Sequence, residues 1–273
     1  MLFPILIFLK KELFRGNNKC YERIFIGGYL MKDLVQDIIK WIKEYFEMSP
    51  PNTKAVIGIS GGKDSTIATA LLVEALGKDR VIGVRMPQGV QSDINIAREV
   101  CDYFGIESYE INIENICETL YQSIGENYKE NPVVSTNTPA RIRMTILYAI
   151  AGMHNGRVVN TSNASEIFIG YSAKNGDSAG DFSITRDFTV RELKKIGYYL
   201  GLPKKFIEKI PEDGMSGKTD EEKLGFSYEV IDDILMYNEF PDEALTKKIT
   251  NLYIKNLHKI SPMPYYYNKG YLE

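Results

Sequence analysis

The sequence predicts an α/β protein with a doubly wound, mostly parallel sheet and helices on both of its faces. Short β-branched runs alternate with segments of helical periodicity from residue 54 onward, and strands connected through helices pair in parallel. Each predicted strand ends in polar residues or in glycine or proline. Because ligands of such sheets bind beyond the carboxyl ends of the strands, we expect one shared site there.

The N-terminal segment does not follow this alternation. Residues 2–9 form an apolar run followed by Lys10 and Lys11. A membrane span needs about 20 apolar residues, and a signal peptide has its positive charge before the apolar run. We therefore expect translation to begin at Met31, with 1–30 as an upstream extension and 31–273 as a single domain.

An amphipathic helix is expected directly after Met31, because apolar residues recur there at helical spacing. Its expected apolar face consists of Leu34, Ile38, Trp41, Ile42 and Tyr45.

Predicted strands and helices alternate between residues 54 and 163. β-branched or alternating runs predict strands at 54–60, 80–86, 108–113 and 157–163. Helical spacing predicts a helix at 65–76, and a second one at 92–105 runs from a capping hydroxyl to a terminal glycine.

The next helix is expected to start at Thr138, with Pro139 in the first helical position, where proline is tolerated. Beyond residue 164 the amino-acid composition changes. The segments 170–183 and 211–225 are rich in Gly, Ser, Asp and Lys, which is typical of solvated connections or of lids over a ligand.

Composition and charge restrict the classes of partner. The formal net charge is -3 over 273 residues, whereas a domain that wraps a nucleic acid usually has a basic excess. Three cysteines without CxxC spacing argue against a zinc cluster or a disulfide framework and favour the reducing cytosol. Neither nucleic acid nor a membrane is expected as a partner.

The loop after the first strand predicts an anion site. Gly61 and Gly62 let the backbone turn close to an anion, and the N-terminus of the following helix presents free N–H groups and partial positive charge. Ser60 and Ser65 can donate hydroxyl hydrogen bonds, and Lys63 can neutralise phosphate charge.

Two better-known phosphate loops do not fit this segment. A Walker A loop would need glycine where Ile57 stands and Ser or Thr where Asp64 stands. The spacing of Gly58, Gly61 and Gly62 does not match the dinucleotide fingerprint either. A carboxylate beside a phosphate is repulsive unless a divalent cation lies between them, so Asp64 implies Mg²⁺.

The SGGKDS segment resembles the loop of the N-type ATP pyrophosphatases, and residues 32–262 resemble the ammonia-dependent NAD synthetases. Beyond the loop, the matching motifs are GVRMPQGVQSD (83–93), NTPARIRM (137–144), NTSNASE (160–166), GYSAKNGDSAGD (170–181) and LHKISPMP (257–264). The resemblance implies an adenine nucleotide alpha hydrolase-like fold and a homodimer. It also implies ATP-dependent amidation of deamido-NAD to NAD through an adenylated intermediate, with release of AMP and pyrophosphate.

Roles for particular residues are implied by the same resemblance. The positions that correspond to ATP contacts are Gly58, Ile59, Ser60, Gly61, Gly62, Lys63, Asp64, Ser65, Arg85, Gln91 and Thr161. Those that correspond to deamido-NAD contacts are Arg141, Lys174, Asp181, His258 and Lys259. Asp64 and Glu166 are implied as Mg²⁺ ligands, and Lys63, Asp64 and Lys174 as catalytic residues.

Two positions depart from the family pattern. Val190 stands where bacterial members have a lysine that contacts ATP, and either Arg191 substitutes for it or the contact is lost. Glu212 stands where a threonine often follows the proline of the later lid, and Ser216 or Thr219 is the candidate replacement.

Other functions remain open on the sequence. Another adenylating enzyme of the superfamily, such as a tRNA thiolase or a GMP synthetase subunit, is one alternative; a thiolase would want reactive cysteines and a basic surface. A nucleotide-sensing module without turnover is another. The chain leaves no room for the amidase domain of glutamine-dependent NAD synthetases, so we expect ammonia to arrive free or from a separate glutaminase partner.

Overall fold

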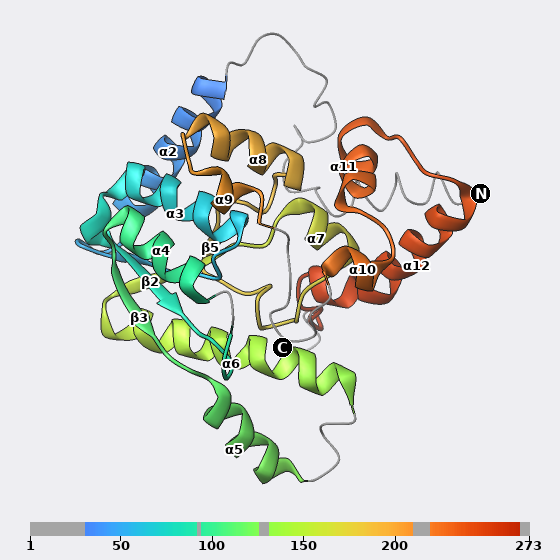
Figure 1. Ribbon diagram of the computed structural model, residues 1–273, viewed down its shortest axis with the longest axis horizontal. Coiled ribbons are helices and arrows are strands. Elements are labelled where there is room, and N and C mark those ends of the chain that lie inside the picture. The colour runs from blue at the N-terminus through green and yellow to red at the C-terminus, as the bar shows by residue number, and fades with distance from the viewer. Residues whose placement is uncertain (1–30, 92–93, 126–130, 210–218, 268–273) are drawn as a thin grey trace, which may run out of the picture.

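The centre of the molecule is a parallel sheet with the strand order β3-β2-β1-β4-β5 (Figure 1). The computed structural model describes residues 31–91, 94–125, 131–209 and 219–267, and the proposed extension 1–30 lies outside them. The strands are β1 (Lys54–Gly58), β2 (Val81–Arg85), β3 (Glu107–Glu110), β4 (Gly156–Asn160) and β5 (Phe182–Ser183). The chain order reverses on either side of β1, so the predicted doubly wound fold class is confirmed.

All four predicted strands are present, each shorter than expected, and β5 was not predicted. β5 has two residues, which pair with Val159 and Asn160 at the end of β4. So short a segment has no recognisable periodicity, and only its pairing with β4 makes it a strand.

One face of the sheet packs against α2 (Met31–Glu47), α3 (Lys63–Leu76), α4 (Ile94–Phe104), α8 (Val190–Tyr199) and α9 (Lys204–Ile207). The other face packs against α5 (Glu114–Ile124) and α6 (Pro132–Met153). Within β1, Ala55 and Ile57 belong to the first of these cores and Val56 to the second. Burial on both faces explains why the strand is continuously apolar.

A third apolar cluster lies beside the sheet. It joins α7 (Ala164–Ile169), α10 (Asp220–Leu224), α11 (Tyr228–Tyr237) and α12 (Glu243–Ile260). Figure 1 shows α11 and α12 on the right, away from the strands. The ring centroids of Phe168 and Tyr253 lie 5.4 Å apart in it, so this cluster fixes α7 relative to α12. A 3-10 turn, η1 (Lys78–Arg80), precedes β2.

The predicted apolar face of α2 is wrong at one edge. The buried residues of α2 are Val35, Ile38, Ile39, Ile42 and Phe46. Trp41 is 45% exposed, and its ring stacks on Tyr45 at 5.9 Å instead. The buried stripe is rotated slightly around the helix because α2 packs on α3 as well as beside β5.

The predicted start of the helix at Thr138 and Pro139 is also wrong. α6 begins at Pro132, and the Asn131 side chain caps it by accepting hydrogen bonds from the first-turn N–H groups. A proline therefore does occupy the first helical position, but it is Pro132 and not the predicted Pro139. Pro139 lies inside the helix, which continues past it at the cost of a main-chain hydrogen bond, because proline has no N–H.

The two polar segments differ in what can be described. Residues 170–181 form turns that follow α7, whereas 210–218 lie outside the described residues. Within the described ranges, no helix combines the length and the apolar character that a bilayer crossing requires.

Candidate active site

The loop of residues 59–62 joins β1 to α3 at the carboxyl edge of the sheet. Gly61 has a φ of +74°, and a Cβ atom there would lie 2.9 Å from the main-chain nitrogen of Ala97. Only glycine fits such a turn without displacing α4. Gly62 is the N-cap of α3 and has no side chain that could cap the first turn. The first-turn N–H groups are therefore available to an anion.

Hydroxyl groups surround this turn. The Oγ atoms of Ser60 and Ser65 lie 3.2 Å apart, and Gly62 N donates to Ser60 Oγ at 3.2 Å. The hydroxyls of Ser65 and Thr66 donate to the Gly62 carbonyl at 3.1 and 2.8 Å. These bonds hold the loop in place before any ligand binds.

Lys63 and Asp64 form an ion pair in the first turn of α3. Lys63 Nζ lies 3.1 Å from Asp64 Oδ2, and the lysine side chain is only 4% exposed. Burial lowers the pKa of Lys63, but the carboxylates of Asp64 and Glu166 outweigh burial and raise it. Lys63 is therefore a permanently charged cation inside the site.

The two carboxylate oxygens of Asp64 have different surroundings. Oδ2 accepts from Lys63 and from the Asn163 side-chain amide at 3.4 Å. Oδ1 is buried and has no hydrogen-bond partner among the described residues. A buried charged oxygen without a partner is costly, so this atom has the surroundings of a ligand atom.

Glu166 faces Asp64 from α7. Its main-chain N–H donates to Asn163 Oδ1 at 2.9 Å, and its Oε2 accepts from Asn163 N at 3.1 Å. This capping box fixes the carboxylate at the end of β4. Burial and the neighbouring Asp64 charge raise the pKa of Glu166 to about 8.

Asp64 and Glu166 fit a divalent cation whose remaining coordination positions are filled by phosphate oxygens and water. The unpartnered Asp64 Oδ1 and the repulsion felt by Glu166 would both be relieved by positive charge between them. The described part of the chain contains no cluster of three or more His, Cys, Asp or Glu side chains that could hold a metal ion. Mg²⁺ commonly uses one or two carboxylates together with phosphate oxygens and water, which agrees with this donor set.

At the ends of β2 and β3, the side chain of Arg85 is already engaged. Arg85 donates to Glu110 Oε2 at 3.1 Å and to Ser108 Oγ at 2.9 Å. Arg98 forms a further ion pair with Glu110. The hydrogen bonds of Arg98 and then Arg85 lower the pKa of Glu110 to about 2. Arg85 is therefore held against β3.

A cavity of about 320 Å³ adjoins this cluster. It is lined by Pro87, Gly89, Val90, Gln91, Ile94, Arg98, Glu110 and Asn112. Asn112 joins the two loops that border it, because its side chain bonds both main-chain groups of Gly89 at 3.1 Å. The structure thus brings Gln91 to the same edge of the sheet as Arg85.

Three cations gather where α6, the 170–181 segment and α12 meet. Arg141 Nε donates to the Lys174 carbonyl at 3.1 Å, and Lys174 Nζ to the His258 carbonyl at 2.6 Å. Lys259 Nζ donates to the Gly170 carbonyl at 3.1 Å. Burial, together with the charges of Lys255 and Arg141, lowers the pKa of Lys259. Because all three donate to neutral carbonyls, their charges can still bind phosphate.

Asp181 is placed apart from these cations. Its Oδ2 accepts from Val158 N at 2.7 Å and its Oδ1 from the Tyr148 hydroxyl at 3.3 Å. The predicted substrate contact at Asp181 would thus come from a carboxylate that also supports β4. Thr161 directly follows β4 and is half-buried at the edge of the sheet.

Val190 and Glu212 are the two positions that depart from the family pattern, and the structure describes only the first of them. The main-chain N–H of Val190 donates to Ser165 Oγ at 3.3 Å, and Arg191 pairs with Asp233 at 2.9 Å. The structure thus gives Arg191 a partner on α11. Thr219 caps α10 through Glu222 N at 3.2 Å, whereas Glu212 and Ser216 lie outside the described residues.

The structure adds site residues that sequence reasoning missed. Asn163 bonds both acids, and its position three residues before a glutamate is a capping-box signal that could have identified it. Tyr228 comes from α11 and has a buried hydroxyl without a hydrogen-bond partner in the described residues. Burial, and then Glu166 and Asp220, raise the pKa of Tyr228. No local pattern in the sequence identifies Tyr228, because the packing of α11 on α7 places it.

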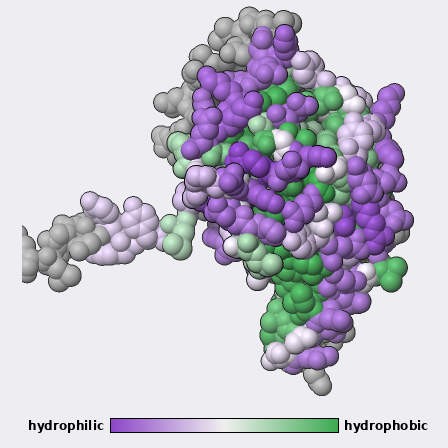
Figure 2. Space-filling view, turned by 90° about the vertical axis from the view of Figure 1, so that its left-hand side faces the viewer, coloured by the Kyte–Doolittle hydropathy of each residue, from purple (hydrophilic) through white to green (hydrophobic). Residues whose placement is uncertain are grey.

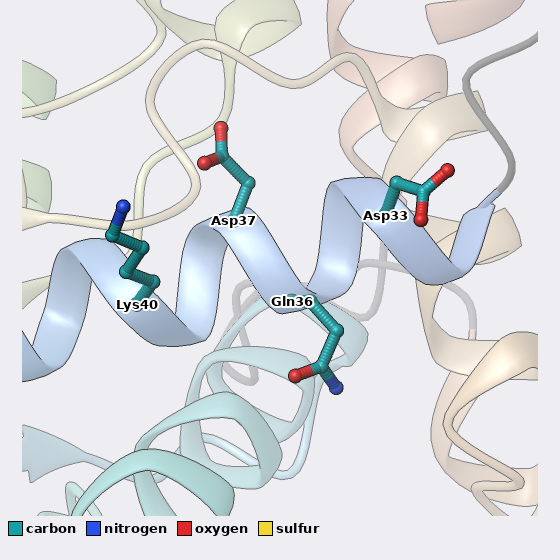
Figure 3. Close-up of a pocket in the computed structure, with 4 residues that line it drawn as sticks. All are labelled: Asp33, Gln36, Asp37 and Lys40. Atoms are coloured by element: carbon teal, nitrogen blue, oxygen red, sulfur yellow. The ribbon is translucent and has the colours of Figure 1, made fainter.

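A second hollow, of about 420 Å³, lies on α2 (Figure 3). Its lining residues are Asp33, Gln36, Asp37 and Lys40, and they project from one helix in different directions. None is a predicted site residue, and the hollow is not at the carboxyl edge of the sheet. Lys63, Asp64 and Glu166 lie together at the glycine turn instead.

Comparison with known proteins shows which family the chain resembles. The model of the family described as NAD synthase matches residues 34–263. The chain is 37% identical to the NH(3)-dependent NAD(+) synthetase of Methanocaldococcus jannaschii, over 86% of this chain and 92% of that protein.

Solved structures give the same result. An NMN synthetase from Francisella tularensis superposes with a TM-score of 0.78 at 30% identity, covering 87% of this chain and 99% of the other. An NH3-dependent NAD synthetase from Campylobacter jejuni does so with a TM-score of 0.71 at 27% identity, covering 88% and 100%.

Proposed function

We propose that this chain, which belongs to the NAD synthase family, converts deamido-NAD to NAD by ATP-dependent amidation with ammonia. A carboxylate oxygen is a poor leaving group, so the acid must be activated first. The nicotinate carboxylate attacks the α-phosphate of ATP, an acyl-adenylate forms, and pyrophosphate departs. Ammonia then attacks the acyl carbon, and AMP leaves together with one proton.

The glycine turn is the proposed site for the departing pyrophosphate. The first-turn N–H groups of α3 and the hydroxyls of Ser60 and Ser65 can donate to its oxygens. Lys63 stays protonated because two carboxylates surround it. Its charge can therefore stabilise the negative charge that develops on the phosphates.

Asp64 and Glu166 are the proposed ligands of Mg²⁺. A bound Mg²⁺ would supply Lewis-acid stabilisation to the phosphate oxygens. The acid pair beside a turn that fits neither a Walker A loop nor a dinucleotide fingerprint is the observation on which the proposal rests. Asn163 helps to hold both acids in position: its side-chain amide donates to Asp64, and its main-chain N–H donates to the Glu166 carboxylate.

Arg141, Lys174 and Lys259 are the proposed contacts for the dinucleotide substrate. His258 and Asp181 are proposed as further contacts to it. The charges of the three cations lie on three separate elements and point to main-chain carbonyls. A substrate with two phosphates fits such a cluster because each phosphate can bind a separate cation. Arg85, Gln91 and Thr161 are the proposed further contacts to ATP.

The assay supplies the purified chain with ATP, deamido-NAD, magnesium chloride and ammonium chloride. NAD, AMP and pyrophosphate should appear in equal amounts. Without ammonium, labelled pyrophosphate should still exchange into ATP when deamido-NAD is present, because adenylation is reversible. ADP and phosphate as products would contradict the chemistry, and no turnover would favour a nucleotide-sensing module.

The mononucleotide acid is a second candidate substrate. The structure with a TM-score of 0.78 has the name NMN synthetase, so an enzyme of this fold makes the mononucleotide. Running the same assay with nicotinate mononucleotide separates the two. We expect the larger kcat/KM with the dinucleotide, and the opposite ranking would assign the chain to the mononucleotide.

A homodimer is proposed as the working form. The side chains of Ile116, Leu120 and Ile124 recur every fourth residue on α5 and are 43%, 39% and 64% exposed. Figure 2 shows apolar residues gathered over the lower part of the molecule, where Figure 1 places α5. A second copy of the chain is the proposed cover for this stripe.

The cytoplasm is the proposed location, since Cys101 and Cys117 are free and buried and unpaired cysteines suit a reducing compartment. Residues 31–273 are proposed to act as one domain. A separate glutaminase partner remains a proposed ammonia source.

A further inference from the structure

Tyr228 has a buried hydroxyl group that the mechanism above does not use. The side chain is 3% exposed, and its oxygen has no hydrogen-bond partner within the described residues. Tyr228 is the first residue of α11, where its main-chain N–H donates to Glu221 Oε1 at 2.9 Å. Buried hydroxyls are nearly always hydrogen-bonded, so an additional group is expected to meet this one.

The surroundings of this hydroxyl are acidic. The carboxylates of Glu166, Asp220 and Asp64 are the charges that act on it. Asp220 Oδ1 already accepts from the Tyr171 hydroxyl at 3.1 Å, and Glu166 Oε2 from Asn163 N. α11 packs directly on α7, the helix of Glu166, which is how Tyr228 comes to face the acid pair.

A second unpartnered atom lies in the same acidic region. Asp64 Oδ1 is buried and lacks a partner, as the Tyr228 hydroxyl does, and the two atoms do not bond each other. One is an anionic acceptor and the other is a hydroxyl that can both donate and accept. A hydrated cation satisfies both, because the cation takes the carboxylate oxygen and a water of its hydration shell reaches the hydroxyl.

We propose that Tyr228 is a positioning residue for the divalent cation, with its hydroxyl hydrogen-bonded to a water of the hydration shell while Asp64 and Glu166 are the direct ligands. This inference rests on the proposed function, which requires the cation. Mg²⁺ keeps several of its waters when it binds to proteins. Mutation of groups in such outer positions typically lowers metal affinity by roughly 10- to 100-fold.

Tyr228→Phe tests this assignment by metal binding. Mn²⁺ is titrated, by electron paramagnetic resonance, into the full chain with an ATP analogue that has a methylene group between the α and β phosphates. Because loss of an outer partner costs roughly 10- to 100-fold in metal affinity, the Kd for Mn²⁺ should rise by at least about 10-fold. Tyr253→Phe is the matched control, since Tyr253 is buried in the same apolar cluster but on α12.

Thermal unfolding gives a second readout. Without cation, Tyr228→Phe should melt at the same or a higher temperature than the wild type, because it removes an unpartnered hydroxyl. The gain in Tm on adding Mn²⁺ and the analogue should be smaller in Tyr228→Phe than in Tyr253→Phe.

The outcomes separate this inference from the proposed function. If the wild type binds Mn²⁺ and Tyr228→Phe binds it equally well, Tyr228 has no role at the cation. A lower Tm or failure to fold without cation would also overturn the inference, because the hydroxyl would then have a partner inside the protein. If the wild type itself binds no Mn²⁺, both the cation site and the role of Tyr228 are rejected.

Discussion

Asp64 has two carboxylate oxygens in different environments, and this difference underlies the first prediction. One oxygen pairs with Lys63, and the other is buried without a partner in the described residues. Asp64→Asn keeps the shape and removes the charge. Because loss of an outer partner of a metal already costs roughly 10- to 100-fold, kcat should fall by at least about 100-fold. Pyrophosphate release measures kcat.

The fold should survive Asp64→Asn, because loss of the Asp64 charge lowers the pKa of Glu166, whose carboxylate can then act as the counter-charge for Lys63; near-UV circular dichroism checks this. Asp79→Asn, at an exposed acid in η1, is the control and should keep full activity. A kcat for Asp64→Asn equal to that of the control would remove Asp64 from the metal site.

Gly61 and Gly77 form a natural pair for a second prediction. Both have positive φ, at +74° and +80°, but a Cβ atom at Gly61 would meet Ala97 N at 2.9 Å while one at Gly77 would meet nothing within 4 Å. Gly77→Ala should cost about 1–3 kcal/mol for its backbone conformation alone. Gly61→Ala should cost about 1–3 kcal/mol more, because α4 must move.

Urea denaturation of the two variants measures this difference. Gly61→Ala should also weaken ATP binding, whereas Gly77→Ala should not. Equal free energies of unfolding for the two variants would show that the loop has room for a side chain and that close approach does not explain the glycine.

Glu110 supports a pH prediction. Its pKa falls from 4.5 to about 2 in the folded protein because of Arg98 and Arg85. A lowered folded pKa gives stability that is complete above pH 4.5 and is lost as pH falls toward 2. Because the carboxylate is 29% exposed, screening reduces the contribution to about 1 kcal/mol.

Glu110→Gln should therefore be about 1 kcal/mol less stable than the wild type at pH 7, and the two should converge as pH falls toward 2. Chemical denaturation at a series of pH values measures this. Glu44→Gln, which changes the exposed Lys40–Glu44 pair on α2, should leave stability nearly unchanged. A constant difference between Glu110→Gln and wild type across the acid range would refute the linkage.

At the scale of elements, α6 starts because of one side chain. Asn131 Oδ1 accepts from Val133 N at 3.0 Å and from Val134 N at 3.3 Å. Asn131→Ala should destabilise the protein by about 1 kcal/mol, since an alanine N-cap leaves these donors without a partner.

Asn131→Asp keeps an acceptor and adds favourable charge at the helix N-terminus, so it should be at least as stable as the wild type. Thermal unfolding compares the two variants. Equal loss in both would indicate that the Asn131 side chain contributes nothing as a cap and that Pro132 alone fixes the start of α6.

The loop–helix junctions around the site share a physical logic. α3 begins with a glycine that caps nothing, whereas α7 begins with an asparagine that forms a complete capping box with Glu166. An uncapped helix start leaves donors for a ligand, and a capped one holds a side chain rigidly. The uncapped start of α3 is therefore the proposed anion-binding turn, and the capped start of α7 fixes the carboxylate of Glu166.

The whole molecule has an uncovered apolar stripe on α5, which leads to the last prediction. Leu120 is the middle of the three exposed residues of that stripe. Leu120→Lys should convert a dimer to a monomer, because a charged ammonium would be buried without a partner in the interface. Sedimentation equilibrium measures the mass.

Met48→Lys is the control for Leu120→Lys, since Met48 is 83% exposed at the end of α2, outside the stripe. It should leave the association state unchanged. A wild-type protein that sediments as a monomer would reject the homodimer, and a dimer unaffected by Leu120→Lys would place the interface elsewhere.

The fold class, the four longer strands and the position of the glycine turn after β1 could be predicted from the sequence. These depend on local properties: β-branched runs, helical periodicity, and glycines between a strand and a helix. Capping chemistry is local too. Asn131 followed by Pro132 is a pattern typical of a helix start, and it predicts the start of α6 better than Pro139 does.

Which side chains share one environment depends on the packing of the folded chain and could not be predicted. Asp64 and Glu166 face each other because β1 and β4 are neighbours in the sheet. Tyr228 lies within the electrostatic influence of both acids because α11 packs on α7. The packing also decided the two-residue strand β5 and the buried stripe of α2, whose periodicity fits more than one rotation. Such choices depend on contacts between residues far apart in the chain, and no local pattern records these.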